Sequence, residues 1–285
     1  MNTLIDLINI NLEKYMDNAY PDKLFESMKY TVLLPGKRLR PLMCLEACRM
    51  FGGNIEDAIP TACAIEMYHA MTLIHDDLPC MDNDDFRRGK PTNHKVFGEA
   101  IAVLAGDALL TYAPQIITKY SKNLKSETIL KIMEEYFQYA GGYGVIAGQV
   151  VDIESEHNYP ENPEETLKFI HTHKTADLFK LAIRTGAIIG GANNEQLKEM
   201  TDFAEKLGFA FQIADDILDE ISTFEEMGKT LGKDKDAGKL TYTGLYGLDN
   251  AKCKLSCLLD ECYDKIRGAK VFESIINDIR KRVGI

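Results

Sequence analysis

The sequence lacks an excess of basic side chains. Lys and Arg number 33 against 44 Asp and Glu, which gives a formal net charge of −11 at pH 7. Proteins that bind nucleic acid draw most of their affinity from a basic surface that neutralises phosphates. We therefore expect no nucleic-acid partner. The total charge does not exclude an acidic small molecule, because a local group of cations can oppose the sign of the whole chain.

The sequence also lacks a Cys-x-x-Cys pair, the spacing typical of many zinc and redox sites. Two pairs of cysteines stand four residues apart within apolar helical patterns, and the total is an odd number. We expect free, buried thiols in a reducing compartment rather than disulfides or a zinc site. The seven cysteines are Cys44, Cys48, Cys63, Cys80, Cys253, Cys257 and Cys262.

No uninterrupted apolar stretch approaches the roughly 18 residues that a membrane-spanning helix needs. No basic segment followed by an apolar one opens the chain, as it would in a secretory signal. We therefore expect a cytoplasmic protein without stable membrane anchoring.

Strand patterns, long linkers and low-complexity tracts are missing as well, whereas amphipathic helical patterns run almost throughout. In residues 201–219 apolar side chains recur at spacings of three and four, and residues 61–77 repeat the pattern with Pro60 and Thr61 as start signals. Short Pro- and Gly-containing breaks separate these patterns. The sequence predicts one all-α domain over residues 1–285, with breaks at Tyr20-Pro21, Leu34-Pro35-Gly36, Gly52-Gly53, Gly89-Lys90-Pro91, residues 157–163 and Gly190-Gly191.

Part of the excess acid is gathered in two clusters, each late in a predicted helix. The second cluster holds Asp215, Asp216 and Asp219, and the spacing of four places its first and last carboxylates on one helical face. The first holds Asp76, Asp77 and Asp82. A straight helix would turn Asp82 about 240° away from Asp76. Because Pro79 cannot continue the helix, we expect the chain to end or bend there and to bring Asp82 back.

Carboxylates held close together repel one another unless a cation lies between them. Hard oxygen ligands suit Mg²⁺, which proteins typically bind through carboxylates and substrate phosphates. A solvated acidic helix end is the plain alternative for a single cluster, but two clusters together favour a metal site. A compact basic segment at residues 36–41 is suited to binding an oxyanion. Together these features indicate a diphosphate held through Mg²⁺ and through Lys and Arg.

From Pro35 to Gly247 the sequence resembles the trans-isoprenyl diphosphate synthases, the farnesyl and geranylgeranyl diphosphate synthase family, in its bacterial and plant form. Several motifs carry the resemblance in the family's order and approximate spacing. They are Gly36-Lys37-Arg38-Leu39-Arg40-Pro41, His69, Asp76 to Gly89, Gly106-Asp107, Gly148-Gln149, His173-Lys174-Thr175, Phe211 to Asp219, and Gly232-Lys233-Asp234 with Lys239.

The resemblance implies a helical bundle around a deep central cavity, commonly as a homodimer, in which three Mg²⁺ hold the diphosphate of an allylic substrate. It implies a catalytic set of Asp76, Asp77, Asp82, Asp215, Asp216, Asp219 and Lys174, with Asp76, Asp82 and Asp215 as the main metal ligands. The implied contacts to the allylic diphosphate are Arg87, Lys174, Thr175, Gln212 and a lysine of residues 229–239, for which Lys229 and Lys239 are named as candidates without a choice among the lysines of that segment. Those to isopentenyl diphosphate are Lys37, Arg40, His69 and Arg88.

The implied reaction joins isopentenyl diphosphate to dimethylallyl or geranyl diphosphate. In the family, the residues five and four before the first aspartate form the floor of the cavity, and here they are Met71 and Thr72. Related bacterial farnesyl synthases often carry an aromatic ring at the position of Met71, and a flexible methionine blocks the cavity less firmly. The expected product is farnesyl diphosphate, with geranylgeranyl diphosphate as the alternative.

Two rival functions share part of this pattern. A terpene cyclase has the first aspartate motif but typically lacks a second Asp-Asp-x-x-Asp, which is present here at residues 215–219. A non-catalytic subunit of a heteromeric synthase would be expected to have lost aspartates, and all six are retained. A phosphate-binding P-loop at Gly228-Lys229-Thr230 fails because the glycine required five residues earlier is Thr223.

Overall fold

A computed structural model describes residues 1–16, 18–221 and 239–285. Within these residues the regular secondary structure is helical apart from one short hairpin, which confirms the predicted all-α class. The N-terminal elements are α1 (Asn2–Tyr15), α2 (Asp22–Val32), α3 (Leu39–Met50), α4 (Ile55–Asp76), β1 (Phe86–Arg87), β2 (Lys90–Pro91), α5 (Asn93–Phe97), α6 (Glu99–Tyr120) and α7 (Ser126–Ala140). They are followed by α8 (Val145–His157), α9 (Pro163–Ile170), a π-helical turn (His171–Ala176), α10 (Asp177–Gly190), α11 (Asn194–Ile221), α14 (Tyr242–Tyr246), α15 (Leu248–Lys265) and α16 (Lys270–Val283).

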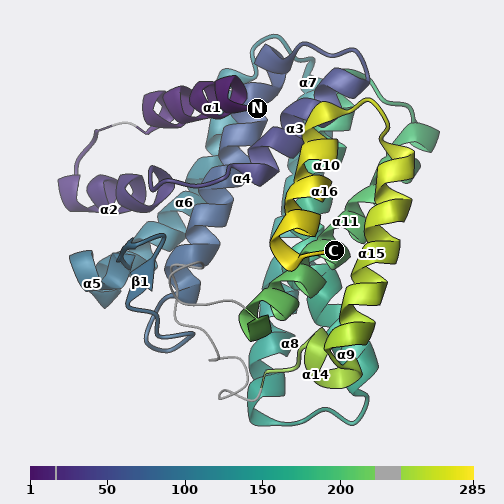
Figure 1. Ribbon diagram of the computed structural model, residues 1–285. Coiled ribbons are helices and arrows are strands. Elements are labelled where there is room, and N and C mark those ends of the chain that lie inside the picture. The colour runs from purple at the N-terminus through teal and green to yellow at the C-terminus, as the bar shows by residue number, and fades with distance from the viewer. Residues whose placement is uncertain (17, 222–238) are drawn as a thin grey trace.

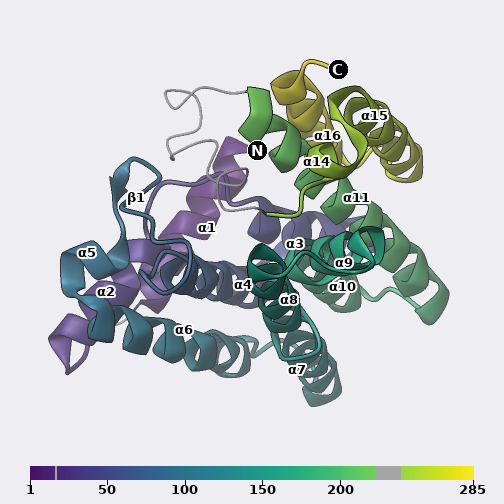
Figure 2. The same cartoon turned by 90° about the horizontal axis from the view of Figure 1, so that it is seen from below.

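Four helices form the centre of the bundle. Helix α3 packs between α4 and α10, and α10 packs in turn on α11. Helix α6 covers α4 from one side, while α15 covers α11 from the other (Figures 1 and 2). The buried apolar side chains of these helices join into one continuous core. The ends of α4 and α11 therefore rest on a rigid framework.

Helix α4 begins earlier than the sequence analysis predicts. Asn54 accepts a hydrogen bond from the Glu56 backbone N–H at 3.2 Å and so caps the helix at Ile55, six residues before the predicted start. Pro60 lies inside the helix instead of opening it. A proline close to the N-terminus removes a single backbone hydrogen bond next to carbonyls that water can reach. The predicted start at Thr61 was therefore wrong.

The other end of α4 behaves as Pro79 predicts. The helix ends at Asp76, and the chain folds back so that the Asp82 N–H donates to the Asp76 carbonyl at 2.9 Å. The chain then enters the antiparallel hairpin of β1 and β2, whose turn has Arg88 at φ 53° and Gly89 at φ 73°. This return brings Asp82 back beside Asp76.

All seven cysteines are free, as predicted, but only four of them are buried. Cys80, Cys253 and Cys257 are exposed, so the prediction of burial was wrong for these three. On α15 the buried side includes Leu255, Leu259 and Cys262, which places the other two cysteines on the outer face. A spacing of four residues defines one face of a helix but does not say which face is packed.

Helix α6 is the single helix in the described part of the chain that is long and apolar enough to cross a membrane. Its most apolar 18-residue window has a mean hydropathy of 1.5, and 44% of that window is buried in the molecule. Asp107 interrupts the apolar run within this continuous helix, so a search for uninterrupted apolar runs does not find α6. The helix packs along α4 and α2.

A π-helical turn joins α9 to α10. Such turns contain one residue more than an α-helical turn and occur often at functional sites. This turn carries Lys174 and Thr175, two residues that the sequence analysis assigns to an allylic diphosphate. Nothing in the helical periodicity of the sequence indicates it.

Candidate functional site

The two aspartate clusters line one polar cavity of about 270 Å³, although 133 residues separate Asp82 from Asp215 in the chain. The end of α4 supplies Asp76, and α11 supplies Asp215 and Asp219. The ionisable side chains around this cavity are Asp76, Asp82, Asp84, Arg87, Asp152, Glu156, His171, Lys174, Asp215, Asp216, Asp219 and Lys239. Cations and carboxylates thus alternate around its wall, as a metal-bound diphosphate requires.

A second, largely apolar cavity of about 580 Å³ adjoins the polar one. The two share Asp76, Met81, Lys174, Gln212 and Asp215. Beyond them the second cavity is lined by apolar side chains from α4, α6, α8 and α11, including Leu73, Leu110, Ile153 and Phe211. A molecule with a charged head and an apolar tail would fit with its head among the aspartates and its tail below them.

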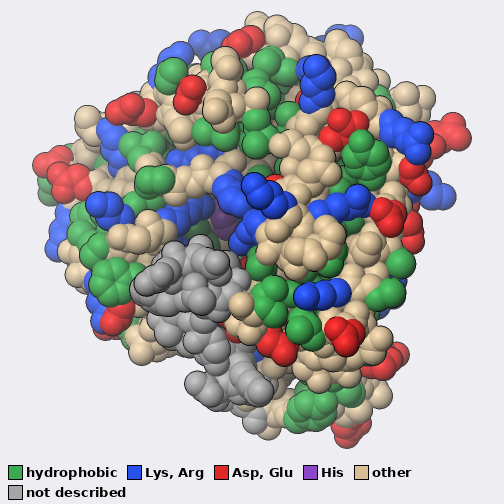
Figure 3. Space-filling model, in the orientation of Figure 1, with side chains coloured by type: hydrophobic (Ala, Val, Ile, Leu, Met, Phe, Trp, Pro, Cys, Tyr) green, Lys and Arg blue, Asp and Glu red, His purple; other side chains and the backbone are tan. Residues whose placement is uncertain are grey.

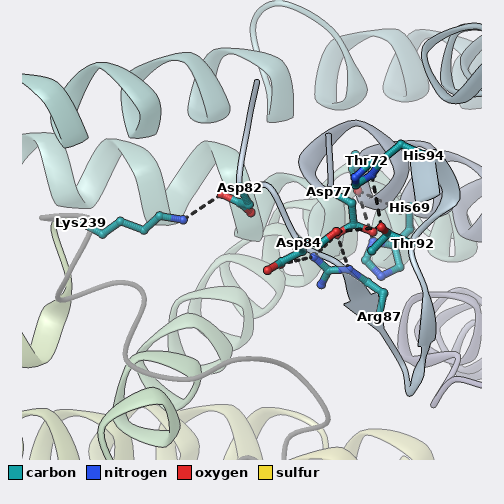
Figure 4. Close-up of polar contacts among 9 residues, drawn as sticks. All are labelled: His69, Thr72, Asp77, Asp82, Asp84, Arg87, Thr92, His94 and Lys239. Carbon is teal, nitrogen blue, oxygen red and sulfur yellow. Dashed lines mark hydrogen bonds and ion pairs between the residues drawn. The ribbon is translucent and has the colours of Figure 1, made fainter. Parts of the chain in front are cut away.

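Two carboxylates of the polar cavity, those of Asp76 and Asp82, have pKa values shifted in opposite directions. Burial raises the pKa of Asp76 to about 6, despite the nearby Lys174. Burial acts in the same direction on Asp82, but Lys239 and Lys174 outweigh it and lower the pKa of that carboxyl. Lys239 Nζ donates to Asp82 Oδ1 at 3.1 Å (Figure 4). It also lies 3.4 Å from Glu156 Oε1. Lys239 therefore bridges α8 and the loop after α4.

The second aspartate of each cluster is committed to other protein groups. Asp77 is buried and accepts from Arg87 Nε at 2.7 Å, while Arg87 Nη2 also reaches Asp84 Oδ2 at 3.2 Å (Figure 4). Asp216 is buried too, and it accepts from Gln212 Nε2 at 2.9 Å and from the Tyr242 N–H at 2.7 Å. These two carboxylates therefore brace their neighbours, and each cluster keeps other aspartates along the cavity wall.

The π-helical turn places Lys174 on the wall of both cavities and Thr175 on the wall of the apolar one. Lys174 Nζ donates to Asp152 of α8. Burial opposes the charge of Lys174, but Asp152 and Asp76 outweigh it and raise the pKa of the ammonium group. Thr175 Oγ1 donates to Gln212 Oε1 of α11 at 2.6 Å. The predicted set Lys174, Thr175 and Gln212 thus meets in one place.

A separate basic pocket of about 260 Å³ lies beside this site. It is lined by Lys37, Arg40, His69 and Arg88, the four residues assigned to isopentenyl diphosphate, together with Pro35, Gly36, Arg38, Leu39 and Glu66. On the face shown in Figure 3, Lys and Arg side chains gather around a central hollow. His69 and Arg40 also line the apolar cavity, so the two spaces share a wall.

The charges in the basic pocket are arranged to receive an anion. Burial, together with Arg40 and Arg88, lowers the pKa of His69 well below its ordinary value, so the ring is neutral at pH 7. Its Nε2 lies 3.3 Å from Arg40 Nη1 and can accept that bond. The buried Arg40 Nε has no hydrogen-bond partner among the described residues, and such a group is costly unless a ligand satisfies it.

The donors at the polar cavity fit Mg²⁺. They are carboxylates, which are hard oxygen ligands, and a cation would relieve the repulsion between Asp76 and Asp82. Within the described residues, no three His, Cys, Asp or Glu side chains converge closely enough to hold an ion by themselves. Mg²⁺ typically keeps several waters and is bound through one or two carboxylates together with substrate phosphate oxygens.

Comparison with known proteins shows which family the chain belongs to. The family model described as polyprenyl synthetase matches residues 21–279. The chloroplastic geranylgeranyl pyrophosphate synthase of Catharanthus roseus is 51% identical over 245 residues, which cover 86% of this chain and 68% of that protein. The chain belongs to the polyprenyl synthetase family.

Solved structures of similar proteins have the same fold. An FPP/GFPP synthase from Zymomonas mobilis superposes with a TM-score of 0.86 at 33% identity, covering 98% of this polyprenyl synthetase and 96% of that chain. A geranyltransferase from Helicobacter pylori, solved with magnesium and isoprenyl diphosphate, superposes with a TM-score of 0.85 at 30% identity, covering 99% and 96%. The predicted resemblance is thereby confirmed.

The residues assigned to chain length lie in the apolar cavity of the polyprenyl synthetase. Met71 is buried and Thr72 is half-buried, and both line the cavity. Tyr68 lies about one turn deeper on α4, where its hydroxyl donates to the Ala140 carbonyl at 2.7 Å and its ring meets Tyr136 edge-on at 5.8 Å. Tyr68, the first Phe, Tyr or Trp met along α4 from Asp76, is thus below the predicted floor.

Sequence reasoning missed several side chains that shape the polyprenyl synthetase site. Asp152 and Glu156 stand four residues apart on α8, and both face the polar cavity. Their acidic i, i+4 spacing was a usable signal. Arg38 was read as part of an anion-binding segment, but its guanidinium is buried and bonds Glu66 at 2.7 Å. Lys229 lies outside the described residues, so its role stays a prediction.

Proposed function

We propose that this polyprenyl synthetase condenses isopentenyl diphosphate with an allylic diphosphate in a Mg²⁺-dependent reaction, with geranylgeranyl diphosphate as the main product. The observation that carries the proposal is the junction of the two cavities, where Asp76, Asp215 and Lys174 lie at the boundary between carboxylates and an apolar chamber. The separate basic pocket beside it supplies a place for a second diphosphate.

Each side of the junction has a defined task in this mechanism. Asp76, Asp82 and Asp215 would hold Mg²⁺, three ions in all, against the allylic diphosphate. Bound Mg²⁺ supplies positive charge that stabilises the leaving diphosphate. Lys174, Thr175, Gln212 and Lys239 bind the same group, and the buried Lys174 is held charged by Asp152 and Asp76. These preorganised donors favour cleavage of the allylic C–O bond.

The second substrate is held in the basic pocket by Lys37, Arg40, His69 and Arg88. Its double bond attacks the allylic cation, a new C–C bond forms, and a proton then passes from the adjacent carbon to the released diphosphate. His69 is neutral, so it can take part in hydrogen bonding without repelling a cation. The apolar side chains below the junction exclude water, which would otherwise capture the cation.

The product length follows from the depth of the apolar chamber. Burying one further five-carbon unit contributes roughly 4 kcal/mol at about 0.8 kcal/mol per CH₂, so growth continues until a side chain blocks the chain end. Met71 and Thr72 place no Phe, Tyr or Trp ring at the predicted floor, and Tyr68 lies deeper than Met71 by roughly 4.5 Å along the helix. The geranylgeranyl synthase from Catharanthus roseus is among the relatives. These points favour a C20 product over the C15 product that the sequence analysis puts first.

Product analysis tests this proposal. Purified protein would be incubated with Mg²⁺, isopentenyl diphosphate and, in separate reactions, dimethylallyl, geranyl or farnesyl diphosphate, and the dephosphorylated products resolved by chain length. We expect a C20 product from all three primers. Accumulation of C15 with no use of farnesyl diphosphate would support the farnesyl synthase assignment instead, and absence of any condensation would contradict the function itself.

A further inference from the structure

Two helices approach the π-helical turn so closely that only glycine fits at the contacts. A Cβ added to Gly148 of α8 would lie 2.1 Å from the Lys174 backbone nitrogen. A Cβ added to Gly208 of α11 would lie 2.5 Å from Ala176 Cα. Both neighbours are backbone atoms, which cannot move aside as the end of a flexible side chain can. The backbone of the π-helical turn is therefore packed directly against α8 on one side and α11 on the other.

Each glycine is followed four residues later by the polar side chain that bonds the turn. On α8, Asp152 follows Gly148 and accepts from Lys174 Nζ. On α11, Gln212 follows Gly208 and accepts from Thr175 Oγ1 at 2.6 Å. Residues four apart lie on one face of a helix. The same face of each helix thus fixes both the backbone of the turn and one of its side chains.

We propose that Gly148 and Gly208 are positioning residues that clamp the π-helical turn and aim Lys174 and Thr175 at the allylic diphosphate. This inference rests on the proposed function, because it assigns the turn to that substrate. The turn directs Lys174 towards Asp152 of α8 and Thr175 towards Gln212 of α11. Lys174 and Gln212 thereby lie at the junction of the two cavities, and Thr175 holds Gln212 from the wall of the apolar one.

The inference predicts an effect on one substrate only. A methyl group at either glycine must push the turn away by a substantial fraction of an ångström, and a displacement of 1 Å near reacting groups can reduce turnover about 100-fold. The basic pocket is built from the loop before α3, from α3 and α4 and from the hairpin, and none of its lining residues belongs to the π-helical turn. Binding of isopentenyl diphosphate should therefore stay unchanged.

The experiment compares Gly148→Ala and Gly208→Ala with Gly186→Ala as the matched control. Gly186 makes an equally close helix contact, since a Cβ there would lie 2.1 Å from the Cys44 carbonyl oxygen, but it joins α10 to α3 away from the turn. Steady-state kinetics would be measured with geranyl diphosphate and isopentenyl diphosphate varied separately, and the melting temperature recorded for each variant.

We expect both clamp variants to lose at least about tenfold in kcat/KM for geranyl diphosphate, while KM for isopentenyl diphosphate stays within about twofold. Gly186→Ala should leave both parameters near wild type even if its melting temperature falls as far. A rise in KM for isopentenyl diphosphate as large as the fall in kcat/KM for geranyl diphosphate, or a matching loss in Gly186→Ala, would overturn the inference. The inference would also be overturned if both Gly148→Ala and Gly208→Ala failed to fold while Gly186→Ala folded. If only one of the two clamp variants folds, the kinetics of that variant test the inference. A wild-type protein without condensation activity would instead refute the proposed function.

Discussion

At the scale of single residues, neighbouring aspartates of one motif do different things. Asp77 and Asp216 are buried against Arg87 and against the Tyr242 N–H, while Asp76 and Asp215 lie at the junction of the two cavities. Successive side chains on a helix point about 100° apart, so Asp215 and Asp216 reach the polar cavity from different directions, and Asp216 has Gln212 and the Tyr242 N–H as partners. The sequence predicts the clusters, but the partners of each carboxylate come from segments far away in the chain.

This division predicts different effects of Asp76→Asn and Asp77→Asn on the Mg²⁺ requirement. Asp76→Asn removes a charge from the proposed metal site, so we expect a loss of at least about 100-fold in turnover and a higher Mg²⁺ concentration for half-maximal rate. Asp77→Asn weakens a buried ion pair, which typically destabilises a protein by about 3–5 kcal/mol when one partner is removed. It should lower the unfolding midpoint and leave the half-maximal Mg²⁺ concentration unchanged.

The measurement is a Mg²⁺ titration of initial rates together with urea denaturation of both variants. Asp249→Asn, on the exposed side of α15, is the control and should behave as wild type. An equal shift of the Mg²⁺ dependence in Asp77→Asn would show that Asp77 is a ligand rather than a brace.

Met71 offers a second prediction at the residue scale. Met71→Phe would place a ring in the apolar cavity one turn above Tyr68, and the rigid ring should stop growth one unit earlier. We expect the main product to change from C20 to C15, measured by chromatography of dephosphorylated products. Met71→Leu keeps a similar volume and should preserve C20. An unchanged product distribution in Met71→Phe would remove Met71 from the floor of the cavity.

At the scale of elements, the helical pattern was predictable while the ends and irregular turns were not. The predicted breaks fall between the observed helices, because Pro and Gly act locally. The start of α4 was missed because the cap at Asn54 competes with the proline signal at Pro60. The π-helical turn was missed because its cause lies in the contacts with α8 and α11. Local sequence cannot report a shape that distant helices impose.

The cap of α4 can be tested on its own. Asn54→Ala removes the side chain that accepts from the Glu56 N–H, and such caps contribute about 1 kcal/mol. We expect the free energy of unfolding, measured by urea denaturation, to fall by about that amount. Activity should stay near wild type because Asn54 lies 22 residues before Asp76, roughly 33 Å along the helix. Asn54→Asp should keep the cap, and a large loss of activity in Asn54→Ala would contradict this account.

At the scale of the whole molecule, exposed apolar side chains on the consecutive helices α6, α7 and α8 are consistent with the predicted homodimer. Leu104 on α6 is 53% exposed, and Phe137 on α7 is 59% exposed. On α8, Ile146 and Val150 are also exposed and at the same time line the apolar cavity. A cavity that protects a cation must be sealed from water. A second copy of the chain on this face would cover these side chains and complete the wall.

Leu104→Glu tests the dimer. Wild-type protein should have twice the chain mass of 32.0 kDa by light scattering, and a charge at this exposed apolar position should favour the monomer because burying an unpaired carboxylate is costly. Ile10→Glu changes an equally exposed side chain on α1 and should remain a dimer. A wild-type mass of one chain would contradict the proposal, as would a dimer unaffected by Leu104→Glu.

The central claim is that diphosphate leaves the allylic substrate as a C–C bond forms, in a site that requires Mg²⁺. The most direct measurement is the stoichiometry of the reaction: released inorganic diphosphate and labelled isopentenyl diphosphate incorporated into product are determined in the same sample, with Mg²⁺ and with excess chelator. The account predicts one diphosphate released for each isopentenyl unit incorporated, and neither in the presence of chelator. Release of diphosphate without incorporation, or incorporation that persists without Mg²⁺, would contradict it.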